Sequence, residues 1–509
     1  MPYDFPMQNQ KSTLAAGWAV FLLLAIGLTC NFAEPDFWSF LNFGRQFWME
    51  GGLPRRDVFS YLPTINPLMI HEWLTWVLFY PVYSQSGPMP LQLLKYASGL
   101  LAAWLAFNAA RNRGASSMGA LAGLFLASYV WAYGFPSVLA RNFSSLFFVA
   151  TIALVEARKS GRHRAAIWWL VPLFALWANL HGGFFTGLAV LGIYAAGETR
   201  PRRPAWLLLG VMAASAAATL ANPYGWKLWS TVLAHGASPD PDIWEWMSIP
   251  RSILVLGWKP ESVLFVMLAV AALPLVLFYG RRDRTSWMML AFFGYLAYSA
   301  HRHIPFFVMA FAVYAPEGLT AWFSRIRDRP RSGLARAAIL ITAAACLVPA
   351  VYDLTYYAAR IRVIREPGSP LELVAPDWDA RANFSFAYPR GAVRFIRENG
   401  LEGKILSELV WGGYLAWELY PQCLIAYDTR TETTFPPQVR RMYYDFFFGR
   451  PGWQDILYAG PPDMVVINAR GPLRRAMDAH PGWREAYSDP ACVLFVPVRF
   501  PGGSLKDRQ

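Results

Sequence analysis

The sequence predicts a polytopic α-helical membrane protein of about eleven spans plus a re-entrant or interfacial helix, followed by a small extracytoplasmic α/β domain. Three observations support this fold class. Of the 509 residues, 55% are apolar and only 16% are charged, against about 25% charged in a typical soluble protein. Apolar segments long enough to cross a bilayer alternate with short basic clusters. Beyond about residue 390, short apolar runs typical of strands alternate with amphipathic helical patterns.

The predicted spans are apolar segments close to the ~20 residues that a bilayer requires. They cover 14–32, 91–110, 117–134, 142–157, 165–180, 182–197, 204–221, 261–279, 286–300, 304–320 and 335–353. The first is too long for a signal peptide and lacks a small-residue cleavage site, so we interpret it as a span.

Basic clusters separate these spans in pairs, so that all of them fit on the cytoplasmic side, as the positive-inside rule requires. They lie at 111–113, 158–164, 200–203, 281–284 and 325–331. The apolar run 71–86, which Pro81 interrupts, breaks this parity if it is counted as a span. We therefore predict a re-entrant or interfacial helix there. The N-terminus is predicted to be cytoplasmic, and the C-terminal domain periplasmic or extracellular.

The predicted organisation is a transmembrane module at 1–360, a linker at 361–390 and an α/β domain at 391–509. The module carries two long outward loops, at 33–70 and 222–260. In the C-terminal domain we expect strands at 404–407, 423–427, 464–467 and 492–496. We expect helices there at 391–399, 413–419, 436–447 and 472–479.

Charge and cysteine content exclude some classes of function. The formal charge of +13 comes from scattered clusters and not from one basic face, so nucleic acid is not an expected partner. The four cysteines show no disulfide framework and no metal-ligand spacing, although a Cys423–Cys492 bridge stays open. The C-terminal domain has no glycine-rich phosphate loop and no nucleophile elbow.

Ionisable residues concentrate in the predicted outward loops, and such residues are costly within a membrane. These residues are Glu34, Asp36, Arg45, Arg55, Arg56, Asp57, His71, Glu72, Arg141, His181, Glu245, His301, Arg302 and His303, and the polar Asn179 accompanies His181. A carboxylate in such a group can take a proton from an attacking hydroxyl while cations hold a phosphate leaving group, as in glycosyl transfer from a lipid phosphate. For any single residue, anchoring a helix end or neutralising a neighbour is the favoured explanation, whereas the ensemble of residues favours a site.

An ordered set of motifs along nearly the whole chain resembles a family of bacterial membrane proteins described as glycosyltransferase-like members of the GT-C superfamily. The motifs are Glu34-Pro35-Asp36-x-Trp38, Gly44-Arg45, Asp57-Val58-Phe59-Ser60-Tyr61, His71-Glu72-Trp73-Leu74, Asn179-Leu180-His181-Gly182-Gly183-Phe184, Asn222-Pro223-Tyr224-Gly225, Trp411-Gly412-Gly413-Tyr414-Leu415 and Asp428-x-Arg430-x-Glu432.

This resemblance implies an inverting glycosyltransferase of the inner membrane. It takes a polyprenyl-phosphate-linked sugar as donor and a glycan, lipid or protein as extracytoplasmic acceptor. Asp36 is the implied catalytic base, and Glu34 is its acidic companion. The two together are the implied ligands of a divalent metal ion such as Mg²⁺ or Mn²⁺.

Other residues are assigned to substrate binding. Arg45, Arg141, His181 and Arg302 are candidates for holding the phosphate. The remaining predicted substrate-binding residues are Asp57, His71, Glu72 and Asn179.

The sequence departs from the family pattern at two places. The family's Trp-Trp-His-Leu run is here Trp38-Ser39-Phe40-Leu41, without the histidine, and an Arg-Pro-Gln turn is here Arg141-Asn142-Phe143. Two alternative functions therefore stay open. One is a transporter or flippase for a lipid-linked glycan, and the other is a catalytically inert assembly subunit of a cell-envelope glycan pathway.

Several motifs also have a purely structural interpretation. Gly182-Gly183 breaks a helix, and Asn222-Pro223-Tyr224-Gly225 is a turn. An Asp428–Arg430 contact would pin a loop. Lys95 and Lys227 would reach lipid headgroups by snorkelling.

Overall fold

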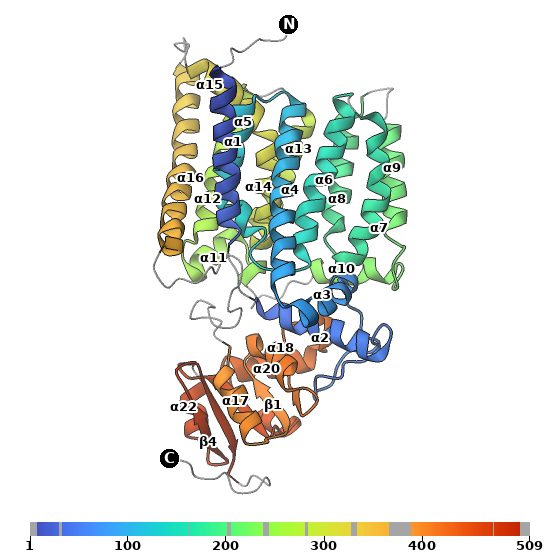
Figure 1. Ribbon diagram of the computed structural model, residues 1–509, viewed down its shortest axis with the longest axis vertical. Coiled ribbons are helices and arrows are strands. Elements are labelled where there is room, and N and C mark those ends of the chain that lie inside the picture. Colours follow the sequence, from blue (N-terminus) through green and yellow to red (C-terminus); the bar gives the residue numbers. More distant parts are fainter. Residues whose placement is uncertain are drawn as a thin grey trace. The chain divides into compact units, whose positions relative to one another are not determined.

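The computed structural model describes residues 8–29, 33–161, 163–200, 205–237, 244–279, 283–326, 333–365, 388–471 and 473–498. The chain forms two compact units (Figure 1). Unit 1 consists of Met1–Asn31, Gln92–Pro136 and Ala140–Val374. Unit 2 consists of Phe32–Leu91, Ser137–Leu139 and Ala375–Gln509. The loop 33–70 therefore belongs to the same unit as the C-terminal strands.

Unit 1 is a bundle of helices that run side by side in Figure 1. The helices are α1 (Gln8–Gly27), α4 (Met89–Arg113), α5 (Ser117–Tyr133), α6 (Arg141–Lys159), α7 (Leu170–Leu180), α8 (Phe184–Glu198), α9 (Trp206–Ala218), α10 (Lys227–Ala237), α11 (Ile249–Leu256), α12 (Pro260–Pro274), α13 (Arg284–Ser299), α14 (Ile304–Tyr314), α15 (Pro316–Ile326) and α16 (Gly333–Arg365). Three short segments are 3-10 helices, η1 (Arg164–Trp169), η2 (Trp244–Trp246) and η4 (His301–His303). A fourth, η3 (Leu275–Tyr279), is a π-helix. Helix α14 packs against α5 and α13 and is the most buried helix of the bundle.

A helix lies over each of the eleven segments predicted as spans. Within the described residues, two helices are long and apolar enough to cross a membrane by length and composition, Met89–Arg113 and Pro260–Leu277. The bent pair His301–Tyr314 and Pro316–Ser324 counts as a third if it is one span. The number of eleven spans therefore stays a prediction. So does the re-entrant nature of 71–86, which forms a helix in unit 2.

The predicted span 304–320 is broken into α14 and α15, which meet at an angle of 46°. Pro316 begins α15. A proline lacks the backbone N–H that continues the ladder of hydrogen bonds, and its ring clashes with the carbonyl four residues earlier. The same proline packs beside Gly123 of α5, where any side chain would collide with its ring.

A buried ionic network joins the helices of unit 1. Arg113 at the end of α4 contacts Glu156 of α6 at 2.6 Å and Asp283, which caps α13, at 3.2 Å. Tyr194 of α8 donates a hydrogen bond to Glu156 at 2.6 Å, and Tyr314 of α14 donates one to Tyr194 at 2.8 Å. Arg113 belongs to a basic cluster that the sequence analysis used as a topology signal, so this residue also has a structural role inside the bundle.

Unit 2 contains a five-stranded sheet in the order β2-β1-β3-β5-β4. The strands are β1 (Gly403–Ser407), β2 (Cys423–Ile425), β3 (Met464–Asn468), β4 (Trp483–Ser488) and β5 (Cys492–Pro497). Strands β2, β1 and β3 are parallel, and β5 and β4 continue the sheet antiparallel. The four strands predicted from apolar runs are all present. The edge strand β4 was missed, because its sequence WREAYS is polar, as is common at a sheet edge.

Helices cover this sheet and complete the predicted α/β domain. They are α17 (Arg390–Glu398), α18 (Gly412–Leu419), α19 (Thr431–Thr434), α20 (Pro437–Phe447), α21 (Asp455–Ala459) and α22 (Leu473–Asp478), with the short turn η5 (Leu409–Trp411). One core forms where α20, α21 and α22 pack against β1, β3 and β5. Leu62, from the loop 33–70, is buried in this same core.

Residues 59–61 extend the sheet at its β2 edge. Ser60 forms a parallel bridge with Ile425. The backbone N–H of Ile425 donates to the Phe59 carbonyl at 2.9 Å, and the N–H of Tyr61 donates to the Ile425 carbonyl at 3.0 Å. A segment more than 350 residues away in the sequence thus covers the exposed edge of β2, which accounts for the discontinuous composition of unit 2.

Two helices of unit 2 precede this sheet in the sequence, α2 (Pro35–Glu50) and α3 (Trp73–Ser86), and they pack on each other. The segment 33–70 was predicted to be a loop, but it contains the helix α2. Polar residues interrupt its apolar pattern, and the structure shows why they are there. Ser39, Asn42 and Gln46 are buried, and Asn42 donates to the Gly413 carbonyl at 2.9 Å.

The Trp411-Gly412-Gly413 motif permits a very close contact between α18 and α2. A Cβ at Gly413 would lie 2.3 Å from the Ser39 hydroxyl and 2.5 Å from its backbone nitrogen. Only glycine fits at such a distance.

The sequence left a Cys423–Cys492 bridge open and predicted a linker at 361–390. Cys423 and Cys492 are both buried free thiols, so the bridge considered for them is not formed. Most of the predicted linker 361–390 lies outside the described residues, which resume at Tyr388.

Replacing Gly413 by Ala is expected to destabilise unit 2 by about 1–3 kcal/mol, because the added methyl group meets backbone atoms that cannot rotate away. Gly52→Ala is the matched control, since nothing lies within 4 Å of its Cβ position in the same unit. The measurement is the thermal unfolding midpoint of the purified protein. Equal midpoints for the two variants would contradict the steric account.

Candidate functional site

The predicted catalytic carboxylates lie at the start of α2. Glu34 is the N-cap residue, Pro35 occupies the first helical position and Asp36 lies in the first turn. Both carboxylates are partly exposed. Glu34 makes no side-chain hydrogen bond to cap its own helix. Negative charge is stabilising at a helix N-terminus, so this position suits two acidic groups close together.

A second pair of predicted site residues lies at the start of α3. Glu72 is the N-cap residue of that helix and is buried, with 7% of its surface exposed. His71 is partly exposed, and its Nε2 lies 3.7 Å from Glu72 Oε1. This distance is an ion-pair contact and is too long for a hydrogen bond. Helices α2 and α3 pack on each other, so the acidic residues at the starts of both helices belong to one packed helix pair in unit 2.

Arg45, a predicted phosphate-binding residue, is engaged by α18. Its guanidinium donates to the carbonyls of Trp417 at 3.2 Å and Tyr420 at 3.3 Å. It also lies over both aromatic rings, 5.7 Å and 5.5 Å from their centroids. A cation at a helix C-terminus satisfies the last carbonyls. This geometry favours an anchoring role between α2 and α18.

Asp57, a predicted substrate-binding residue, belongs to a buried ionic triad with Arg430 and Asp428. Arg430 Nη1 donates to Asp57 at 2.6 Å, and Arg430 Nε and Nη2 contact Asp428 at 2.8 Å. All three side chains have no exposed surface. Asp57 also accepts a hydrogen bond from the Ser60 backbone at 2.8 Å. The triad thus fixes the 57–60 turn to the loop after β2.

Burial dominates the electrostatics of this triad. It raises the pKa of the Asp428 carboxyl, and the adjacent Arg430 guanidinium opposes that rise. Burial alone would lower the pKa of Arg430, but the two flanking carboxylates hold it above its usual value. The Arg430 guanidinium is therefore permanently charged, and both Asp57 and Asp428 are needed to compensate its burial.

In unit 1, the predicted outward turns are linked by polar contacts. Arg141, the first residue of α6, pairs with Glu245 at 3.4 Å. The Arg302 guanidinium lies 4.1 Å from the centroid of the Trp246 ring. Glu245 and Trp246 both belong to η2, so one turn of the 222–260 loop contacts two of the predicted phosphate-binding arginines.

His181 is held by a hydrogen-bond chain that determines where its proton lies. The backbone N–H of Gly183 donates to His181 Nδ1 at 3.0 Å. The Trp177 indole donates to the Ser144 hydroxyl at 2.7 Å, and that hydroxyl lies 2.7 Å from the same Nδ1. A backbone N–H can only donate, so Nδ1 carries a lone pair, and Nε2 carries the proton of the neutral ring. His181 therefore acts as a neutral hydrogen-bond donor through Nε2.

The Asn179-Leu180-His181-Gly182-Gly183 motif has two further structural features. Asn179 donates to the carbonyls of Ala175 and Ala221, both at 2.8 Å, and so joins the end of α7 to the turn after α9. A Cβ at Gly183 would lie 2.2 Å from the Ser144 hydroxyl. Glycine at that position therefore preserves the contact between Ser144 and His181.

No family model matches the chain, and no curated protein matches it. Solved structures do match. The crystal structure of ArnT from Cupriavidus metallidurans bound to undecaprenyl phosphate aligns over 96% of this chain and 99% of that chain, at 14% identity and a TM-score of 0.51. The archaeal oligosaccharyltransferase AglB from Archaeoglobus fulgidus, in complex with an inhibitory peptide and a dolichol-phosphate, aligns over 98% of this chain and 76% of that chain, at 11% identity and a TM-score of 0.53.

The chain has a GT-C-like fold. A mutant of the arabinofuranosyltransferase AftD from mycobacteria agrees, with 15% identity and a TM-score of 0.50 over 96% of this chain and 41% of that one. The resemblance drawn from the motifs is thereby confirmed at the level of the fold. The membrane location stays a prediction, and the fold agrees with it.

Sequence reasoning missed two features of the site region. Ser144 gave no signal, because its hydroxyl lies within an apolar helix and its role depends on Trp177 and His181. Glu156 was detectable as a carboxylate inside a predicted span, which is a recognised marker of a structural or functional partner.

Removing Arg430 should cost much more stability than removing an exposed arginine of the same unit. Arg430→Gln leaves two buried carboxylates without a partner, a change that typically costs about 3–5 kcal/mol. Arg397→Gln breaks an exposed pair with Glu418 and should cost about 1 kcal/mol or less. Thermal unfolding of both variants tests this, and equal losses would contradict a central role for the triad.

The tautomer of His181 is measurable by ¹⁵N NMR of histidine-labelled protein, with His181→Asn used to assign its signals. We expect a neutral ring with an unprotonated Nδ1 and a protonated Nε2 near pH 7. Ser144→Ala should change these signals and leave those of the other histidines unchanged. A proton found on Nδ1 would refute the assignment.

Proposed function

We propose that the protein is a glycosyltransferase that transfers a sugar from a polyprenyl-phosphate-linked donor to an extracytoplasmic acceptor with inversion. The observation that carries this proposal is the likeness over almost the whole chain to two structures in complex with polyprenyl phosphates, undecaprenyl phosphate in one and a dolichol-phosphate in the other. The acidic helix start at Glu34 and Asp36 supplies the chemistry that such a transfer needs.

The proposed reaction is a single displacement. The acceptor oxygen forms a bond to the anomeric carbon while the bond between that carbon and the phosphate oxygen breaks. The leaving polyprenyl phosphate keeps the electron pair, and the acceptor's proton passes to the Asp36 carboxylate. Attack opposite to the leaving group inverts the anomeric configuration. We assign Arg141, His181 and Arg302 to the leaving phosphate, with His181 donating one neutral hydrogen bond.

Glu34 and Asp36 also fit a divalent cation by donor chemistry. Mg²⁺ and Mn²⁺ prefer carboxylate oxygens, and both side chains are partly exposed at the same helix start. A bound ion would neutralise charge on the donor phosphate. We assign Arg45 and Asp57 to holding unit 2 together, on the basis of their contacts with α18 and Arg430.

Asp36→Asn should lower the release of polyprenyl phosphate from a lipid-linked sugar donor by about 10²–10⁴-fold, the usual contribution of a general base. Glu50→Gln is the matched control, because Glu50 is an exposed carboxylate at the other end of the same helix. The readout is chromatographic quantification of the released lipid phosphate, with and without a chelator. Full turnover in Asp36→Asn would refute its role as the base.

Analysis of glycans from a deletion strain distinguishes the other functions. Loss of one sugar from the acceptor supports transfer. Accumulation of an inward-facing lipid-linked precursor would indicate a flippase, and unchanged glycans would indicate an inert assembly subunit. Either of the last two outcomes would overturn the proposal.

A further inference from the structure

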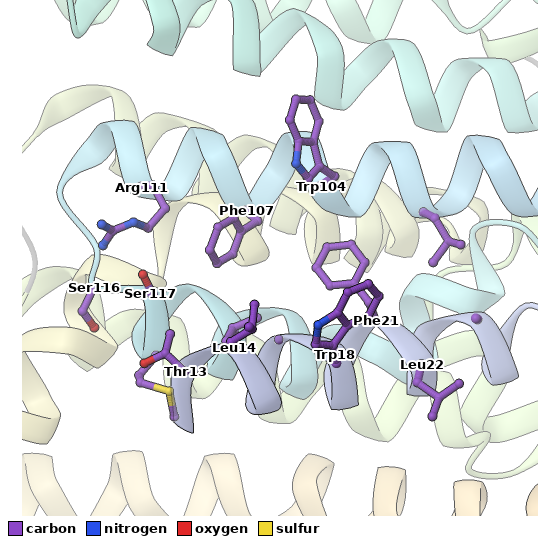
Figure 2. Close-up of a pocket in the computed structure, with 15 residues that line it drawn as sticks. Thr13, Leu14, Trp18, Phe21, Leu22, Trp104, Phe107, Arg111, Ser116 and Ser117 are labelled. Carbon is purple, nitrogen blue, oxygen red and sulfur yellow. The ribbon is translucent and has the colours of Figure 1, made fainter. Parts of the chain in front are cut away.

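A large apolar groove lies in unit 1 between α1, α4 and the start of α5 (Figure 2). Its volume is about 1190 Å³, above the ~300–1,000 Å³ of ordinary small-molecule sites. Aromatic and aliphatic side chains form most of the lining, and two of them, Trp18 and Trp104, are 73% and 54% exposed. In a membrane protein, an exposed apolar groove of this kind is in contact with lipid chains.

Leu28, the residue that follows α1, lies against Gly99 of α4, one residue before Leu100 of the lining. From there the lining runs along α1 and α4 toward Arg111, with Phe21 and Phe107 lying between the two helices (Figure 2).

The polar residues of the lining gather at one end. Arg111 comes from the last turn of α4, Ser116 and Ser117 from the start of α5, and Thr13 from the first half of α1 (Figure 2). The Ser116 hydroxyl accepts a hydrogen bond from the Gly119 backbone at 3.0 Å, and it lies 3.2 Å from the Thr320 hydroxyl, which donates its own proton to the Pro316 carbonyl. Arg111 and Ser117 are therefore the donors best placed for a ligand.

Arg111 differs sharply from Arg113, two residues later. Arg113 is buried and neutralised by Glu156 and Asp283. Arg111 is exposed and donates one hydrogen bond to the Ala115 carbonyl, and no acidic residue in the described part of the chain pairs with it. Its guanidinium has five N–H donors, so most of its donor capacity faces the groove mouth unused. A cation at the polar end of an apolar groove is complementary to an anionic lipid headgroup.

The length of the groove decides which lipid fits. Its lining on α1 runs from Thr13 to Ala25, which corresponds to about 18 Å of helix. The hydrocarbon of one leaflet is about 15 Å thick, half of the ~30 Å core. An acyl chain that begins at a headgroup beside Arg111 would therefore fill the groove within one leaflet.

We propose that this groove binds one anionic glycerophospholipid. Its phosphate accepts hydrogen bonds from Arg111 and Ser117, and an acyl chain lies between α1 and α4. The lipid fills the space between the two helices, so it stabilises the position of α1. This site is independent of the proposed glycosyl transfer.

Native mass spectrometry of the full-length protein in mild detergent, titrated with phosphatidylglycerol or phosphatidylcholine, tests the proposal. Wild type should retain one phosphatidylglycerol in preference to phosphatidylcholine, and Arg111→Gln should bind it about tenfold more weakly, the loss expected for a charge-assisted hydrogen bond. Arg284→Gln is the matched control, an exposed arginine at a helix start that does not line the groove.

A second variant separates lipid loss from misfolding. Gly17→Phe should fill the groove and abolish retention with Arg111 intact, and it should fold, because the nearest atom to the Gly17 Cβ position is 4.0 Å away. Equal binding of the two phospholipids, or equal binding by wild type and Arg111→Gln, would overturn the proposal. Preferential retention of a polyprenyl phosphate, or of a transmembrane peptide, would overturn the assignment to a phospholipid.

Discussion

Unit 2 depends on one buried arginine. Arg430 is completely enclosed and is neutralised by Asp428 from its own loop and by Asp57 from a segment 373 positions earlier. A charge in such a place is tolerated only while both partners are present, since an unpaired buried ion costs several kcal/mol. The contact therefore restricts the chain to arrangements in which the 57–60 turn lies beside the loop after β2.

Further contacts join the same early and late segments of unit 2. Residues 59–61 pair with β2, Leu62 enters the core of the sheet, and Asn42 and Arg45 of α2 bond to carbonyls of α18. The helix that begins with Glu34 and Asp36 is thus held by the C-terminal strands and helices. The proposed catalytic carboxylates lie on a helix that is held by residues more than 300 positions later in the sequence.

Some features of the proposed site were predictable from the sequence, and others were not. The basic clusters indicated which ionisable residues are predicted to face outward, and ordered motifs indicated the GT-C-like fold. The roles of Arg45 and Asp57 could not be read in this way. A lone arginine or aspartate looks the same in sequence whether it meets a substrate or a helix carbonyl, and only the contacts with Trp417, Tyr420 and Arg430 distinguish the two.

The sequence by itself determined the helices that lie over the eleven predicted spans and four of the five strands, because hydrophobic periodicity is a local property. It did not reveal α10 and α11, which lie within the predicted loop 222–260. It also did not reveal α2, whose polar residues Ser39, Asn42 and Gln46 are buried and bond to Thr429, Gly413 and Arg56 outside this helix. It also did not reveal the tautomer of His181, which Gly183, Ser144 and Trp177 impose together. Only the tertiary structure decided these features, since a buried polar group takes its meaning from a partner that the local sequence does not contain.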